Sequence, residues 1–115
     1  MAKKLFAMLL LLCSLPCWGH SQLVKSEPEN EAVLSTPPPQ LNLFFDKQIE
    51  PTLHQAELWH EGSWRKLPTT AGDRTLTISL PDKNDKAALK QYRIRWSVLS
   101  SDGHRQRGQI QFSIR

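Results

Sequence analysis

Apolar and polar residues alternate along several short stretches of the chain. The clearest stretch spans residues 92–98, where every second side chain is apolar: Tyr92, Ile94, Trp96 and Val98. The same alternation occurs in residues 41–45, 76–80 and 110–114. A period of two is typical of a β-strand with one buried face, because successive side chains point to opposite sides of a sheet. We therefore predict a strand at each of these stretches.

Two further stretches complete the predicted set of strands. Residues 56–58 and 64–67 carry apolar side chains on either side of a turn signal at Glu61 and Gly62, which predicts a β-hairpin. A first short strand is expected at residues 22–25. The whole set amounts to about six or seven short strands.

Prolines separate the predicted strands and interrupt any long helix. Seven of them lie beyond residue 19: Pro28, Pro37, Pro38, Pro39, Pro51, Pro68 and Pro81. The run at 37–39 is expected to form a loop. Only residues 82–90 favour a helix, of about two turns at most. About seven short strands at this spacing predict one all-β domain, folded as a two-sheet antiparallel sandwich.

The beginning of the chain follows a different pattern. Residues 5–12 form a continuous apolar run that follows two lysines and precedes a short exit ending in Gly19. This order is typical of a secretory signal peptide. The run is shorter than the roughly 20 residues that a permanent membrane span needs. We predict cleavage after Gly19, which removes residues 1–19 and leaves residues 20–115 as one domain without a membrane span.

Sulfur is confined to the predicted signal peptide. Cys13 and Cys17 both lie there, as do both methionines, so residues 20–115 contain neither a thiol nor a thioether. A lipoprotein-type cleavage before either cysteine is disfavoured, because Leu12 and Pro16 occupy the position where that pathway needs a small residue. The domain must therefore be stabilised by its packed core and not by a disulfide.

The charge balance argues against a nucleic-acid partner. The chain has 15 Lys and Arg, of which Lys3 and Lys4 lie in the signal peptide, so residues 20–115 hold 13 against 11 Asp and Glu, a net charge of +2. A nucleic-acid-binding domain shows a clustered basic stripe and a larger excess. Nucleic acid is therefore excluded as a partner.

Two histidines occupy positions suited to metal binding. Cleavage after Gly19 makes His20 the first residue, so its free amine and its ring nitrogen can chelate one ion together. Between the two most regular predicted strands, Asp102 precedes His104 by two residues and Gly103 allows the backbone to bend, so a carboxylate and an imidazole can point to one spot. Three nitrogens and one oxygen suit Cu(II). Zinc accepts the same donors but prefers a tetrahedron.

Each of these features also has an ordinary structural explanation. A terminal histidine can belong to a disordered end, and an Asp-Gly pair is a common hairpin signal. His54 and His60 are expected to be surface or hairpin residues, and Trp96 is expected in the core. Arg105 and Arg107 are expected to be solvated charges that can also dock an acidic partner.

Four segments of residues 20–115 carry a resemblance to a known family: residues 20–28, residues 41–46, residues 92–104 with their Ser-Asp-Gly-His ending, and residues 108–114. In these segments the chain resembles the CopC family of periplasmic copper-binding proteins. The resemblance implies an immunoglobulin-like sandwich with Greek-key connections. It also implies one Cu(II) per mature chain, held by His20, Asp102 and His104.

The resemblance further implies a copper carrier or buffer in copper resistance, not an enzyme, located in the periplasm and often beside a membrane partner of the CopD type. Two departures limit it. Many relatives begin His-x-His, whereas the third residue of the predicted mature chain is Gln22, and the methionine-rich loop of some relatives is absent. Thioether ligands select Cu(I), so a second site for Cu(I) is not supported.

Two other classes of function stay open. A copper monooxygenase can also use a terminal histidine brace on a sandwich. However, about 96 residues leave little area for a flat substrate surface, and Asp102 would occupy a position that this chemistry needs open. A metal-free adhesion or subunit module would use the sandwich alone.

Overall fold

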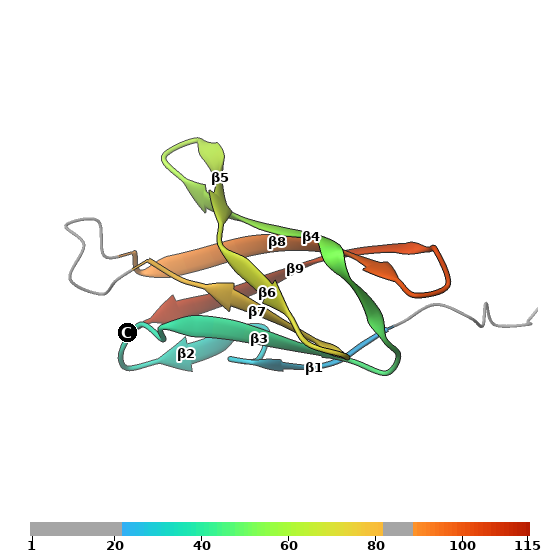
Figure 1. The fold of residues 1–115 in the computed structure, drawn as a ribbon. Helices are drawn as coiled ribbons and strands as arrows, with labels where there is room; N and C mark the ends of the chain where they lie inside the picture. The colour runs from blue at the N-terminus through green and yellow to red at the C-terminus, as the bar shows by residue number, and fades with distance from the viewer. Residues whose placement is uncertain (1–21, 82–88) are drawn as a thin grey trace, which may run out of the picture.

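The structure is a computed structural model that describes residues 22–81 and 89–115. The predicted signal peptide, His20 and most of the helix-favouring stretch lie outside the described residues. Nine strands form in the described part of the chain (Figure 1): β1 Leu23–Glu27, β2 Ala32–Leu34, β3 Gln40–Phe45, β4 Ile49–His60, β5 Ser63–Leu67, β6 Thr69–Ala71, β7 Thr75–Ser79, β8 Gln91–Ser100 and β9 Arg105–Ile114. In these residues no helix is long and apolar enough to cross a membrane.

The strands build two sheets that face each other. One sheet has the order β1-β3-β7-β6 and the other the order β2-β9-β8-β4-β5. All neighbouring strands are antiparallel except β2 and β9, which pair in parallel. The connections β3–β4, β5–β6 and β7–β8 each cross from one sheet to the other, as Greek-key connections do. The predicted immunoglobulin-like β-sandwich is confirmed.

The core consists largely of the alternating apolar side chains that the sequence pattern singled out, with Ile49 as an addition. Residues from the two facing sheets make up this cluster: Leu41, Leu43, Phe45, Ile49, Ala56, Leu58, Leu76, Ile78, Leu80, Tyr92, Ile94, Trp96, Val98, Ile110 and Phe112. Burial of these side chains supplies the main stabilisation of a domain that has no disulfide. Trp96 is 5% exposed, which confirms its predicted core position.

The observed strands differ from the predicted set in number and length. The strands β2 and β6 were not predicted, because three residues are too few to show an alternation. Strand β4 begins at Ile49, well before the predicted residue 56. The alternation did not reveal its first part, because the register of β4 against β8 shifts between Ile49 and His54. Residues 35–39 form the expected proline-rich loop. Of the helix-favouring stretch, Leu89 and Lys90 are described and are not helical.

Strands β8 and β9 form the longest hairpin and fix the position of the loop between them. Their register runs without a shift from Gln91 opposite Ser113 to Leu99 opposite Arg105. In the middle of this ladder Gly108 lies opposite Trp96, and a Cβ atom added to Gly108 would lie 2.5 Å from Cζ2 of the indole. The missing side chain of Gly108 therefore makes room for the indole.

Candidate metal centre

A tight turn connects β8 to β9 and shapes the candidate metal centre. The Gly103 N–H donates to the Ser100 carbonyl at 2.9 Å, and the Ser100 N–H donates to the His104 carbonyl at 2.7 Å. Gly103 has a φ of 92°, in the left-handed region that glycine adopts at little cost. The Asp-Gly pair thus provides the bend that the sequence predicted, and it places Asp102 and His104 on the same turn.

The side chains of Asp102 and His104 come together in this turn. Oδ1 of Asp102 lies 3.3 Å from Nδ1 of His104 and accepts a hydrogen bond from the His104 backbone N–H at 3.2 Å. Both side chains are open to solvent, His104 at 59% and Asp102 at 38% exposure. An imidazole and a carboxylate are donors that Cu(II) accepts, and their exposure allows an ion to reach them. The chemistry of this pair therefore fits a copper ion.

The first described residue of the chain lies at the same end of the sandwich as this turn. The Gln22 N–H donates to Oδ1 of Asp46 at 2.7 Å, and the Asp46 N–H donates to the Gln22 carbonyl at 3.0 Å. Two residues further along, the Gln48 carbonyl accepts from the Ser101 N–H at 3.1 Å. Figure 1 shows the start of β1, the β3–β4 connection and the β8–β9 turn together at one end of the molecule.

Asp46 is the residue at this end to which the sequence assigned no role. It follows β3 directly and fastens the chain near its start through both its side chain and its backbone N–H. The Arg74 guanidinium adds a hydrogen bond to the Asp46 carbonyl at 3.3 Å. Asp46 and Gln22 are 24 residues apart, so no local pattern could predict their contact.

The other two described histidines have structural surroundings. Nδ1 of His54 lies 2.7 Å from the Thr69 hydroxyl and Nε2 lies 2.9 Å from the Pro51 carbonyl, so both ring nitrogens are engaged. His60 is the last residue of β4, at the predicted hairpin, and its Nδ1 is buried without a hydrogen-bond partner among the described residues. Both positions agree with the predicted surface or hairpin roles.

Within residues 22–81 and 89–115, no group of three or more His, Cys, Asp or Glu side chains is placed to hold a metal ion. Asp102 and His104 alone provide two donor side chains. The third predicted ligand, His20, lies outside the described residues.

A two-sheet antiparallel sandwich with connections that cross between the sheets defines the class of immunoglobulin-like domains. Residues 23–115 match the CopC domain family model, and the chain belongs to this family. The predicted membership is therefore confirmed.

Named relatives agree with this membership. The chain is 31% identical over 117 residues to Copper resistance protein C of Xanthomonas campestris pv. juglandis, covering 90% of this chain and 87% of that protein. It is 30% identical over 120 residues to Copper transport protein CutJ of Bacillus subtilis strain 168, covering 93% of this chain but 20% of that protein. Neither name is that of an enzyme. This agrees with the expectation from the sequence that the chain is not an enzyme.

The fold is similar to the crystal structure of CopC from Methylosinus trichosporium OB3b. The TM-score is 0.70 at 25% sequence identity, and the match covers 83% of this chain and 93% of that chain. The similarity thus extends over most of both chains.

Proposed function

We propose that the protein carries or buffers Cu(II) in the periplasm and acts there in copper homeostasis or resistance. The observation that carries the proposal is the meeting of Asp102 and His104 at 3.3 Å, at the end of the sandwich that also holds Gln22, the first described residue. Membership of the CopC family and the copper-related names of two relatives support the choice of metal.

His20 completes the proposed set of ligands. Removal of residues 1–19 as a signal peptide would free the amine of His20, so that amine and ring would bind one ion together with Asp102 and His104. In the proposed site His20 would reach the ion from Gln22, which it precedes by two residues, and two residues of chain span at most about 7 Å. The proposal therefore requires the ion to lie within reach of both Gln22 and the β8–β9 turn.

The donor set favours Cu(II) over Cu(I). It consists of nitrogen and oxygen atoms, and residues 20–115 contain no sulfur ligand of the kind that Cu(I) selects. One ion per chain is expected, because His20, Asp102 and His104 form one proposed set of donors around one ion. The exposure of Asp102 and His104 would let copper pass to another protein, for which an inner-membrane protein of the CopD type is the expected receiver.

The proposal is tested with protein purified from the periplasm of expressing cells, with its first residue determined by mass spectrometry. Competitive titration with a Cu(II) chelator then gives stoichiometry and affinity for the wild type and for His20→Ala, Asp102→Ala and His104→Ala. Each substitution should weaken Cu(II) binding by about tenfold or more. His60→Ala, which removes a histidine at the opposite end of β4, is the matched control and should bind as the wild type does.

Two results would contradict the proposal. Wild-type Cu(II) affinity in the His104→Ala variant would show that the imidazole of the β8–β9 turn is not a copper ligand. Absence of Cu(II) binding by protein that begins at His20 would favour a metal-free interaction module.

A further inference from the structure

The outer surface of the five-stranded sheet carries a concentration of arginines. Most inward positions of β8 and β9 are apolar, Ser100 and Gln106 being exceptions. The alternate positions point outward, and four of these are exposed arginines: Arg93, Arg95, Arg105 and Arg107. We call these four residues the arginine face. By contrast, the outward positions of β3 and β7 carry no charge: Gln40, Asn42, Phe44, Thr75, Thr77 and Ser79. At the β1 edge of the same sheet, Lys25 pairs with Glu27 at 2.7 Å, so these two charges offset each other. The two sheets therefore differ in the positive charge of their outer surfaces.

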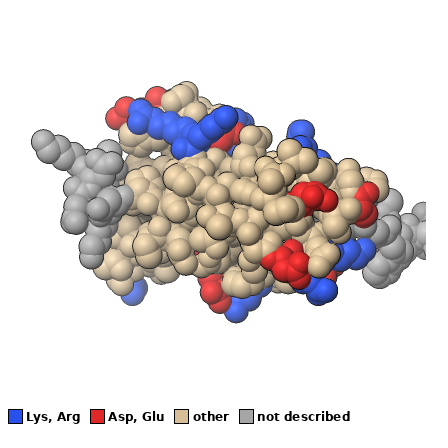
Figure 2. All heavy atoms as spheres, viewed as in Figure 1, with Lys and Arg blue, Asp and Glu red and all other residues tan. Residues whose placement is uncertain are grey.

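Figure 2 shows the molecule from one side, with one group of Lys and Arg side chains over the β4–β5 hairpin, further ones around the edges of the view and a largely uncharged middle. The net charge of +2 in residues 20–115 thus hides an uneven distribution. Such an arrangement attracts partners of opposite charge to one part of a protein even when its total charge is small.

The arginine face is held in place by its neighbours. Arg95 lies opposite Glu57, with Nε 2.9 Å from the carboxylate, and its guanidinium carbon lies 4.2 Å from the centre of the Trp64 ring. Nη1 of Arg105 donates to the Ser97 hydroxyl at 2.7 Å. These contacts use few of the five N–H donors that each guanidinium has. The arginines are therefore oriented and still have donors to offer.

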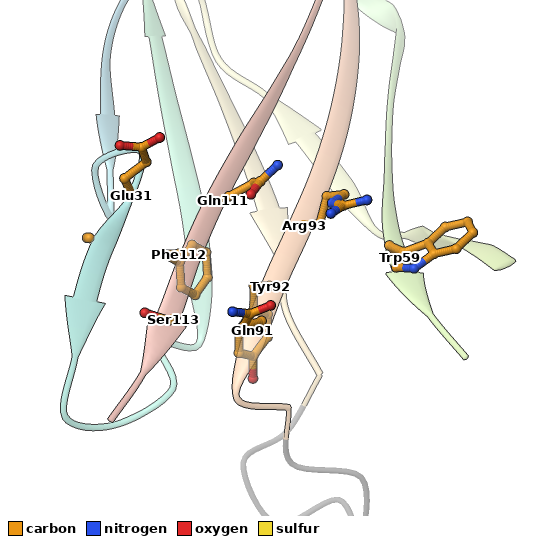
Figure 3. Close-up of a pocket in the computed structure, with 9 residues that line it drawn as sticks. Glu31, Trp59, Gln91, Tyr92, Arg93, Gln111, Phe112 and Ser113 are labelled. Carbon is orange, nitrogen blue, oxygen red and sulfur yellow. The ribbon is translucent and has the colours of Figure 1, made fainter. Parts of the chain in front are cut away.

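Arg93 and Arg107 form no ion pair with a carboxylate in the described part of the chain. Arg107 lies opposite Ser97, which follows Arg95 by two residues on β8, so Arg107 and Arg95 are diagonal neighbours on the outer surface. Figure 3 shows the Arg93 side chain between those of Gln111 and Trp59, so polar and aromatic groups flank it. Both arginines can thus accept a partner's carboxylate without giving up an internal one.

Three hollows of about 250, 450 and 280 Å³ run along this surface, and each is lined by at least one residue of the arginine face. The second and third are neighbours, because Gln55 and Arg107 line both. Together the linings of the three hollows contain the four arginines and two carboxylates, Glu31 and Glu57. The surface is therefore a shallow groove with an excess of positive charge.

We propose that the arginine face binds an acidic segment of a partner protein, lying along this groove. Guanidinium groups bind carboxylates through pairs of parallel hydrogen bonds, which gives direction as well as attraction. An extended chain can follow a groove, whereas a flat lipid surface does not reach into its hollows. The groove therefore fits an acidic polypeptide better than a membrane.

One end of the groove reaches the candidate metal centre, because Arg105 directly follows His104. A bound partner would lie beside the proposed copper ion, and this last step alone rests on the proposed function. Docking at the arginine face would then bring the receiver of the copper next to its donor.

The test uses protein purified from the periplasm and a fluorescein-labelled peptide of ten glutamates as the probe. Fluorescence anisotropy should show binding that weakens with added salt, because exposed charges are screened within about 8 Å at physiological ionic strength. A peptide of ten glutamines should not bind. In the double variant Arg93→Gln/Arg107→Gln the affinity for the acidic peptide should fall by about tenfold.

The matched control is Arg65→Gln/Arg115→Gln, which removes the same charge from exposed arginines outside the arginine face and should stay within about twofold of the wild type. Equal losses in both double variants would show attraction to net charge only and would overturn the proposal. So would binding to phosphatidylglycerol vesicles that depends on Arg93 and Arg107 while the acidic peptide does not bind.

Copper titration of the same variants separates the two proposals. Arg93→Gln/Arg107→Gln should keep wild-type Cu(II) affinity, since neither residue is a proposed ligand. Peptide binding that depends on the arginine face would stand even if the protein bound no copper. Copper binding without peptide binding would refute the arginine face and leave the proposed function intact.

Discussion

Gly108 provides the sharpest test of the packing that supports the candidate metal centre. A methyl group at this position would lie 2.5 Å from Cζ2 and 2.8 Å from Cε2 of Trp96. Carbon atoms prefer separations of about 3.5–4.0 Å, so the overlap is about 1 Å. The indole has little freedom to withdraw, because it is 5% exposed and packs edge-on against Phe45 at a centroid distance of 5.4 Å.

We predict that Gly108→Ala destabilises the protein by about 1–2 kcal/mol. Overpacking of a core typically costs about 1–3 kcal/mol. The loss of glycine flexibility in the unfolded chain offsets about 0.4–1 kcal/mol of that cost, since Gly108 has no positive φ that alanine would resist. For a domain of this size, such a loss lowers Tm by roughly 4–15 °C.

Urea denaturation followed by far-ultraviolet circular dichroism measures this change without relying on tryptophan fluorescence. The decisive comparison is a double-mutant cycle with Trp96→Phe, whose smaller ring leaves space for the added methyl. Nε1 of Trp96 has no hydrogen-bond partner among the described residues, so this replacement removes no hydrogen bond seen there. In the Trp96→Phe background, Gly108→Ala should cost at least about 1 kcal/mol less than in the wild type.

Two results would refute this reasoning. One is wild-type stability in Gly108→Ala, which would mean that the indole moves aside freely. The other is additivity of the two changes within about 0.5 kcal/mol, which would mean that the cost of the methyl does not come from Trp96.

Four further predictions follow from the proposed site and from the burial of one tyrosine. Protein that begins at His20 should bind one Cu(II) with the ligand-field spectrum of a tetragonal N,O site. One extra residue before His20 should weaken this binding sharply. Binding of two ions per chain would contradict the prediction. Cu(I) should bind much more weakly than Cu(II), so ascorbate should release copper to a Cu(I) chelator, and tight retention would be the opposing result. As the pH is lowered, Cu(II) affinity should fall by about one decade per pH unit near neutrality and more steeply below about pH 6, because protons compete for each nitrogen donor. An affinity that does not change with pH would exclude the proposed ligands. Burial raises the pKa of the Tyr92 phenol. As the pH rises, the unfolded chain therefore loses this proton before the folded chain does. The free energy of unfolding should be unaffected by this group below about pH 10 and should decline above it. Urea denaturation should show a smaller decline in Tyr92→Phe.

The sequence predicted most of the fold because one face of each main strand is buried. Strands β3, β7, β8 and β9 were found from the alternation alone, and the Asp-Gly pair predicted the turn that joins Asp102 to His104. The strands β2 and β6 were missed because three residues carry no measurable period. The contact of Gln22 with Asp46 was missed because it joins positions 24 residues apart. The contact bears on the proposed copper site, since it holds Gln22, the first described residue, at the end of the sandwich that carries the turn.

The β8–β9 hairpin connects the core, the candidate metal centre and the arginine face through its register. A shift of one residue would turn every side chain of a strand to the opposite side of the sheet. Arg93 and Arg95 would then face the core, and the β8–β9 turn would lose its Asp-Gly bend. The contact of Trp96 with Gly108 favours the observed register, because in it the indole fills the space that a side chain at position 108 would occupy. This buried fit therefore helps to hold Asp102 and His104 at the β8–β9 turn and the arginine face on the outer surface.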